Sequence, residues 1–334
     1  MADSIRSWRS PEFPVKDRLA VLQRRLNEFQ PASFIADAKW NKGDGGGDIE
    51  FVSRTLSTAK GHLPEYLIEA WCLGTFMLSA CSFGVLLFHP ASPAAAIEPT
   101  ARGVLMGIAM GLTAILIITS PWGKRSGAHF NPAVTLAFYR LGKISGTDAA
   151  FYVAAHFIGG VLGVLLAWAI LGERLAASTV NFVVTVPGVY GTSAAAAGEF
   201  LIAFVQMTLI LVISNTMRLS RFTPFIAGTM VALYIAIEAP VSGMSMNPAR
   251  TFASAAVAGQ WDGWWIYFTA PPAAMLAAAE VYARSRGMHR VLCAKLDHTG
   301  RSRCIFKCGY HDAAPEAIEI TKESPAFKTA AGLF

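Results

Sequence analysis

The sequence predicts an all-α membrane protein with six transmembrane helices and two half-helices in an inverted repeat. Three observations support this fold class. Of the 334 residues, 54% are hydrophobic and 15% are charged, so a soluble protein would need an unusually apolar surface. The apolar residues are gathered into six blocks, and an Asn-Pro-Ala triplet occurs twice.

The six apolar blocks have the length of membrane spans. Each has roughly 15 to 25 residues, and about 20 are needed to cross the hydrocarbon core. The first block begins more than sixty residues into the chain, after a charged segment, so we interpret it as a genuine span and not as a cleavable signal. The blocks are residues 66–88, 103–119, 149–171, 194–213, 225–239 and 264–281.

Basic residues beside these spans predict the orientation. The first-to-second and third-to-fourth connections hold Arg102 and Arg174 alone, whereas the other connections and the segment after the last span are richer in Lys and Arg. By the positive-inside rule we expect both termini in the cytoplasm, with the protein in a plasma or inner membrane. The residues that decide this are Lys124, Arg125, Arg218, Arg221, Arg284, Arg286 and Arg290.

Composition divides the chain into three parts. Residues 1–63 form a polar, cytoplasmic N-terminal extension that we expect to be partly disordered. Residues 64–284 form the membrane domain, and residues 285–334 form a cytoplasmic C-terminal tail with a Cys/His cluster. The formal net charge of +6 is interpreted as juxtamembrane charge that meets anionic lipid, and nothing in the pattern suggests nucleic acid.

The membrane domain repeats itself. Glu69 opens a span in the first half and Glu199 opens one in the second. In each half a second span follows, then a loop with Ser-Gly, an Asn-Pro-Ala triplet, a short apolar stretch and a third span. Because each half crosses the membrane an odd number of times, the halves must be inserted in opposite senses.

The triplets predict two half-helices. Proline after asparagine favours an extended or turn conformation at the asparagine and supplies a pre-set first helical residue. The stretches that follow, 133–139 and 249–257, are too short to span but reach from mid-membrane to one surface at ~1.5 Å per residue. Irregular backbone at that depth must be buried in protein or line a wet cavity. The triplets are Asn131-Pro132-Ala133 and Asn247-Pro248-Ala249.

Two helix N-termini that meet at the bilayer centre predict a pore for neutral molecules. Their positive dipole ends, together with the amides of Asn131 and Asn247, would repel a cation or hydronium. Water would offer its oxygen to both amides, which interrupts a proton-conducting chain of hydrogen bonds.

Longer motifs surround the triplets, with SGAHFNPAVT at 126–135 and SGMSMNPAR at 242–250. They look like the two signatures of the major intrinsic protein (aquaporin) family, and the resemblance covers about residues 65–284. It implies a homotetrameric passive channel, not an enzyme, that moves water or small uncharged solutes such as glycerol and excludes protons and ions. It also implies that Arg250 is the arginine of the outer constriction.

The same resemblance places the other constriction residues at Met110, Ile235 and Met244. Gly111 is an alternative to Met110, because the first loop is one residue longer than usual in the family. Ile235 stands where water-selective relatives carry His, and Thr251 where many glycerol channels carry Asp. Such a ring predicts small, partly apolar neutral solutes alongside water, with low conductance if the flexible methionines narrow the pore.

Two carboxylates in matching repeat positions and one histidine within the predicted spans need a role. Glu69 and Glu199 could form a proton relay, or they could accept hydrogen bonds from backbone N–H groups of the re-entrant loops. We favour the second role, which the resemblance also implies, because a carboxylate that holds irregular backbone in place offsets the cost of its burial. His156 is either a pH-sensing group or a polar residue packed between helices.

The Cys/His cluster is a second, weaker signal. Cys293, His298, Cys304, Cys308 and His311 fall within nineteen residues. Three thiolates and an imidazole can form a tetrahedral zinc site, and we take Cys293, Cys304, Cys308 and His311 as its candidate ligands. The spacing follows no common zinc pattern, so unliganded reduced thiols are the alternative.

Two other functions fit parts of the pattern. A secondary transporter also uses inverted repeats and broken helices, but it needs intramembrane groups that bind a coupling ion. A non-conducting membrane scaffold of the same fold would account for the bulky constriction residues. An enzyme is not indicated, because the sequence shows no nucleophile–base pair and no intramembrane metal cluster.

Overall fold

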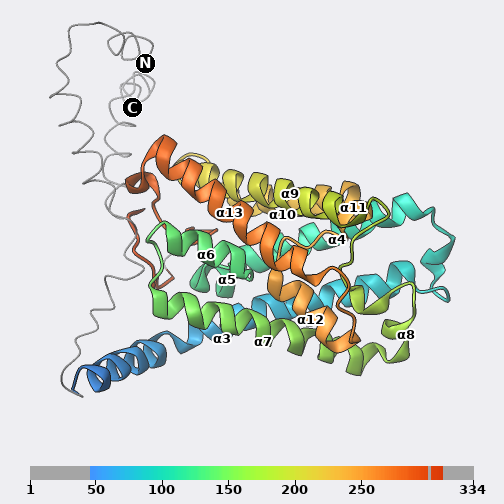
Figure 1. Cartoon of the computed structure of the whole chain (residues 1–334), viewed down its shortest axis with the longest axis horizontal. Coiled ribbons are helices and arrows are strands. Elements are labelled where there is room, and N and C mark those ends of the chain that lie inside the picture. The colour runs from blue at the N-terminus through green and yellow to red at the C-terminus, as the bar shows by residue number, and fades with distance from the viewer. Residues whose placement is uncertain (1–45, 300–301, 311–334) are drawn as a thin grey trace, which may run out of the picture. The chain divides into compact units, whose positions relative to one another are not determined.

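The computed structural model describes residues 46–299 and 302–310. Residues 1–45 of the expected N-terminal extension, and the tail from residue 311 with His311, lie outside the described residues. Within the described ranges every regular element is an α-helix or a 3-10 helix, which confirms the all-α prediction (Figure 1). The described residues from 52 onward belong to one compact unit.

Six long helices carry the six predicted spans. Five of the described helices are long and apolar enough to cross a membrane by length and composition. The remaining one, α13, has 23 residues, but it is rich in alanine and has Glu280, Arg284 and Arg286 near its end, which lowers its mean hydropathy. Its length is still sufficient for a crossing. The bounds are α3 Gly46–Phe88, α4 Pro99–Thr119, α7 Gly146–Leu171, α9 Gly191–Ser214, α10 Thr223–Ile237 and α13 Trp264–Arg286.

Two shorter helices begin at the triplets, as predicted. They are α6 (Pro132–Arg140) and α12 (Pro248–Ala258), and both lie in the middle of the bundle in Figure 1. Each is preceded by a one- or two-turn helix that occupies the same place in its half of the repeat. The short elements are α5 Pro121–Ser126, α8 Glu173–Ala176, α11 Ala239–Ser242, η2 Pro93–Ala96, η3 Asn181–Val183, η4 Ser220–Phe222 and η5 Met288–Arg290.

Glycines bring the long helices into close contact in both halves. A Cβ on Gly159 of α7 would lie 2.1 Å from the carbonyl oxygen of Ala70 on α3, so the two backbones touch there. A Cβ on Gly111 of α4 would lie 2.6 Å from the carbonyl oxygen of Gly228 on α10. Small residues at such crossings are typical of helix packing in membranes.

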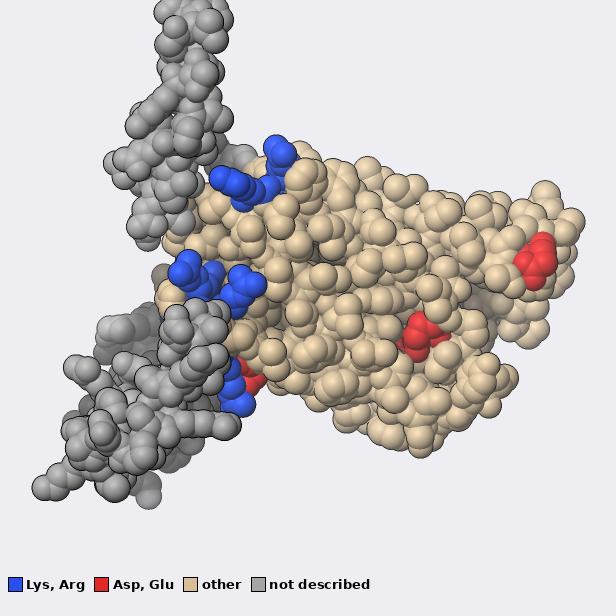
Figure 2. All heavy atoms as spheres, turned by 90° about the horizontal axis from the view of Figure 1, so that it is seen from above, with Lys and Arg blue, Asp and Glu red and all other residues tan. Residues whose placement is uncertain are grey.

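The outward faces of the bundle are apolar. Leu112 and Leu116 on α4, and Leu162 and Ile170 on α7, are between 55% and 69% exposed, whereas Glu69 and other polar groups are fully buried. Figure 2 shows a face made almost entirely of uncharged residues, with Lys and Arg side chains gathered at one end. Contiguous exposed apolar surface of this kind is rare on soluble monomers and is suited to contact with lipid.

Candidate functional site

The loops that lead into α6 and α12 share an unusual backbone conformation. Ala128 and Phe130 in the first loop have φ angles of 53° and 31°, and Met244 and Met246 in the second have 49° and 53°. A left-handed conformation at a residue other than glycine costs roughly 1–3 kcal/mol and persists only where surrounding contacts enforce it. Strong contacts must therefore hold both loops.

Two buried carboxylates provide these contacts. Glu69 accepts hydrogen bonds from the backbone N–H groups of residues 129 and 130, at 3.1 and 2.7 Å. Glu199 accepts hydrogen bonds from those of residues 245 and 246, at 2.6 and 2.7 Å. Each carboxylate thus satisfies two consecutive buried donors with charge-assisted bonds.

Each carboxylate also has a side-chain partner. Glu69 Oε2 lies 2.8 Å from Nε2 of His156, which is buried between α3 and α7. In the second half, Ser242 Oγ lies 2.7 Å from Glu199 Oε1 and 2.8 Å from Glu238 Oε2. A hydroxyl has one proton to donate, so one of these two carboxyl groups must itself carry a proton. Because Glu199 already accepts two backbone N–H groups, the proton belongs on Glu238.

Glu238→Gln is therefore expected to be tolerated, because the amide can donate to Ser242 Oγ as the neutral carboxylic acid does. We expect the free energy of unfolding to change by less than about 1 kcal/mol, the size of one neutral hydrogen bond. Thermal unfolding in detergent measures this, with Glu238→Ala as the control that removes the donor. A Glu238→Gln protein that unfolds as easily as the Ala variant would show that the carboxyl is ionised.

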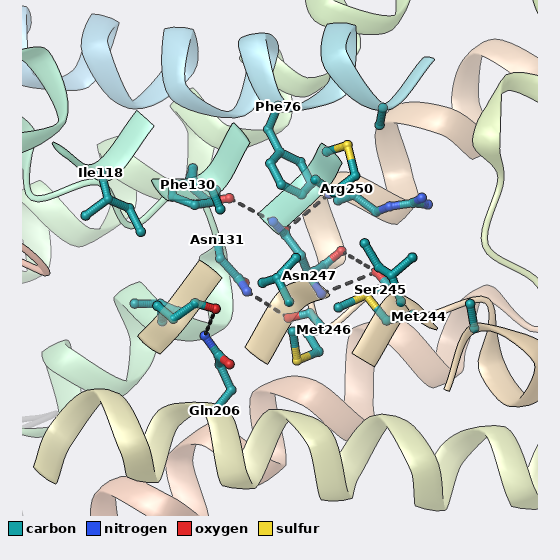
Figure 3. Close-up of a pocket in the computed structure, with 18 of the residues that line it drawn as sticks. Phe76, Ile118, Phe130, Asn131, Gln206, Met244, Ser245, Met246, Asn247 and Arg250 are labelled. Atoms are coloured by element: carbon teal, nitrogen blue, oxygen red, sulfur yellow. Dashed lines mark hydrogen bonds between the residues drawn. The ribbon is translucent and has the colours of Figure 1, made fainter. Parts of the chain in front are cut away.

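Asn131 and Asn247 join the two loops across the middle of the bundle (Figure 3). Nδ2 of Asn131 donates to the carbonyl oxygen of Met246, and Nδ2 of Asn247 donates to that of Phe130, both at 2.7 Å. The Oδ1 atoms accept the N–H two residues further on, at 2.8 and 3.0 Å, and so cap α6 and α12. These bonds use one of the two hydrogens on each Nδ2.

A cavity of about 240 Å³ passes both asparagines. It extends from Phe88 and Gly103, near the ends of α3 and α4, to Leu296 in the segment after α13. Its wall is mostly apolar, from the α4 methionines to Val134 of α6, so the few polar groups that reach it stand out. These polar residues are His129, Asn131, Gln206, Ser245, Asn247 and Arg250.

The four residues expected at the constriction all line this cavity: Met110, Ile235, Met244 and Arg250. Gly111, the alternative to Met110, packs against α10 and is absent from the cavity wall. Arg250 Nη1 donates to the carbonyl oxygen of Val183 at 2.8 Å. Val183 belongs to a turn in which residues 181–183 all have φ between 45° and 50°.

Each half-helix is thus preceded by a loop that one buried carboxylate holds, and the two loops are joined by the two asparagines. A family model described as Major intrinsic protein matches residues 62–282. The chain belongs to the major intrinsic protein family. Members of this family are passive channels and not enzymes, so the chain is an integral, multi-pass membrane channel for water or small solutes.

Sequence relatives of this major intrinsic protein include plant aquaporins. It is 31% identical over 238 residues to Aquaporin NIP1-2 of Oryza sativa subsp. japonica, covering 70% of this chain and 76% of the relative. It is 34% identical over 179 residues to Nodulin-26 of Glycine max, covering 53% and 64%.

Among solved structures, the aquaglyceroporin from Plasmodium falciparum has the same fold. The match has a TM-score of 0.56 with 16% identity, and covers 67% of this chain and 96% of the other.

Among the residues of this channel's cavity that were not predicted from the sequence, two stand beside the asparagines. Phe76 on α3 and Gln206 on α9 each lie seven residues after the buried glutamate of their half, and both face the cavity beside the asparagines (Figure 3). Gln206 Nε2 donates to the carbonyl oxygen of Ala227 at 3.3 Å, while its buried Oε1 has no partner among the described residues. Seven residues are close to two helical turns, so the repeat could have pointed to both positions.

The candidate zinc ligands after α13 are partly brought together. Cys293, Cys304 and Cys308 converge, and His298 completes the group, with all four ligand atoms within 4.8 Å of one another. His311, the imidazole chosen from the sequence, lies outside the described residues.

Proposed function

We propose that this chain forms a passive pore for water and small, partly apolar, uncharged solutes, and that it excludes protons and ions. The cavity carries this proposal. Its wall is mostly apolar and includes Phe76 and Met275. Its main hydrogen-bond donors are the two asparagine amides and the Arg250 guanidinium. Molecules in single file would slide along the apolar wall and accept hydrogen bonds only at those donors.

The asparagine geometry supports the proposed exclusion of protons. Each Nδ2 donates one hydrogen to a carbonyl oxygen of the opposite loop, so its second hydrogen can bond to a molecule in the cavity. A water that accepts from both amides turns its own hydrogens away from the centre, so no continuous proton-conducting chain forms. The N-termini of α6 and α12 add positive potential at the same place.

The preferred solute class follows from the other polar and bulky groups. Met110, Ile235 and Met244 present apolar surface to the same cavity as Arg250, so a solute with an apolar side loses little there. Deeper in the cavity, Gln206 lines the wall, and its Oε1 is buried and has no partner among the described residues; rotation of the amide would offer this acceptor to a hydroxyl or N–H group. Small polyols, amides and neutral acids have both features.

Gln206→Leu is expected to lower glycerol permeability more than water permeability. The substitution removes one solute hydrogen bond of about 0.5–1.5 kcal/mol, which corresponds to a roughly 2- to 10-fold decrease. Stopped-flow light scattering of proteoliposomes measures both rates, and Gln206→Glu, which keeps an acceptor of similar size, is the matched control. Equal losses for both permeants would contradict a solute contact at this residue.

A permeability panel tests the proposed substrate class. Proteoliposomes would be challenged with water, glycerol, urea and a small neutral metalloid acid. We expect flux that rises linearly with the gradient and falls with solute size. Saturable flux that needs an ion gradient would indicate a transporter, and flux equal to that of empty liposomes would indicate a scaffold.

We further propose that both termini lie in the cytoplasm of a plasma or inner membrane, and that the channel is a homotetramer in a lipid bilayer. The last turn of α13 carries Arg284 and Arg286, and Figure 2 shows Lys and Arg side chains gathered at one end of the molecule; both observations support this orientation. Protease cleavage of a C-terminal tag only in inside-out vesicles tests the orientation. Light scattering of the detergent complex, expected at four copies of the 35.8 kDa chain, tests the assembly.

A further inference from the structure

The segment after α13 folds into a compact Cys/His cluster. Cys293 Sγ lies 3.5 Å from Cys304 Sγ, and His298 Nε2 lies 3.1 Å from Cys308 Sγ. With Zn–S bonds of about 2.3 Å and Zn–N bonds of about 2.0 Å, neighbouring ligand atoms of a tetrahedral site lie roughly 3.4–3.8 Å apart. The four atoms, all within 4.8 Å of one another, need only small shifts to reach that geometry.

A disulfide does not account for this group. A bond between Cys293 and Cys304 would need its sulfurs about 2.05 Å apart and would leave a third thiol and an imidazole converging on the same point without a role. Thiols on a cytoplasmic face are also kept reduced. Three sulfurs and one ring nitrogen form a recognised donor set for zinc.

A buried lysine provides an independent indication of a charged occupant. Lys295 is 2% exposed, and its Nζ donates to the carbonyl oxygens of Ser302 and Arg303 and to the Ser302 hydroxyl, all of them neutral. Among the described residues it makes no salt bridge, and it is close enough to all three cysteines and to the buried Glu65 to interact with them electrostatically. Zinc with three thiolates and a neutral imidazole has a net charge of −1, which places a further negative charge beside this lysine.

Neighbouring contacts orient the ligands. The His298 ring stacks on Tyr310, with ring centroids 4.2 Å apart, and the Tyr310 hydroxyl donates to the carbonyl oxygen of Ser214 at 2.5 Å. Asp297 accepts the backbone N–H of Thr299 at 2.8 Å, which shapes the turn that follows His298. Contacts that hold the metal-binding side chains in place in this way are typical of metal sites.

The cluster is connected to the inner end of the cavity. Between Cys293 and His298, the carbonyl oxygen of Ala294 lies 2.8 Å from His129 Nε2, and the N–H of Leu296 donates to the carbonyl oxygen of Gly127 at 3.1 Å. The Leu296 side chain is 4% exposed and lines the cavity. The same short segment therefore carries two of the four ligands and one wall of the inner mouth.

We propose that Cys293, His298, Cys304 and Cys308 bind one zinc ion, and that the bound metal holds Leu296 in the inner mouth of the pore and so lowers its permeability. The metal site does not depend on the proposed channel function, whereas the effect on permeability rests on that function.

Metal analysis of the full-length purified protein tests the site. After incubation with zinc and removal of free metal, we expect about one zinc per chain. Cobalt in place of zinc should give the visible absorption of a tetrahedral sulfur-ligated ion. Cys304→Ser and His298→Ala should lose the metal, whereas Cys72→Ala, a matched thiol on α3, and His311→Ala should keep it. Zinc retained in both ligand variants, or lost in His311→Ala, would overturn the ligand assignment.

Proteoliposome permeability tests the second half of the proposal. Removal of zinc with a membrane-permeable chelator should raise solute flux roughly fivefold, a change that corresponds to about 1 kcal/mol. Leu296→Ala should raise flux to the same level while the metal stays bound. If zinc leaves and flux is unchanged, the metal has no role in the pore. If no form conducts although zinc binds, the proposed function fails and the metal site stands.

Discussion

Glu199→Leu is expected to prevent the second half of the channel from folding. The leucine would leave the backbone N–H groups of residues 245 and 246 without their acceptor, and the Ser242 hydroxyl would keep only Glu238 as a partner. Each unpaired buried donor costs about 1–3 kcal/mol, and the left-handed residues Met244 and Met246 would lose the contact that enforces them. The sum is comparable with the whole stability of a typical protein, about 5–15 kcal/mol.

Size-exclusion chromatography and thermal unfolding in detergent measure this effect. Glu199→Gln is the matched control, since its single amide oxygen can replace only part of the carboxylate, and it should be intermediate. Glu238→Gln, at the residue linked to Glu199 through the Ser242 hydroxyl, should behave like the unmodified protein. A folded Glu199→Leu protein with unchanged unfolding would show that the carboxylate does not hold the loop.

Arg250→Ala is expected to open the channel to larger solutes and to cations. The substitution removes the guanidinium from the cavity wall together with its bond to Val183. A cation 4 Å from that charge is repelled by roughly 4 kcal/mol at an effective dielectric of about 20. Even half of that barrier corresponds to an increase in cation leak of about 30-fold.

Ion flux and solute size cut-off in proteoliposomes measure the change. Arg250→Lys is the control, because it keeps the positive charge but lacks the planar guanidinium that reaches Val183. It should still exclude cations while its solute discrimination loosens. Unchanged discrimination in Arg250→Ala would remove this residue from the selectivity filter.

The features that could be predicted are those that the membrane enforces locally. A span needs about 20 apolar residues, and proline after a capping asparagine starts a helix, so α6 begins at Pro132 and α12 at Pro248. The buried glutamates could be found because the repeat places each at the start of a half. Fold class and family followed from these signals.

Other features depend on contacts between distant segments. Gln206 looks like any polar residue in an apolar helix until α9 is placed beside the asparagines. The proton on Glu238 follows only from two carboxyl groups that share the Ser242 hydroxyl. His298 replaces His311 in the zinc proposal because the turn after Asp297 brings its ring to Cys308, and no spacing rule predicts that turn.

The most direct test of the account compares water and proton flux in the same proteoliposomes. The vesicles would contain a pH-sensitive dye and be subjected first to an osmotic step and then to a pH step. We expect fast, non-saturating water flux, with proton flux no greater than in empty liposomes. Proton flux that rises together with water flux would contradict a pore interrupted at Asn131 and Asn247.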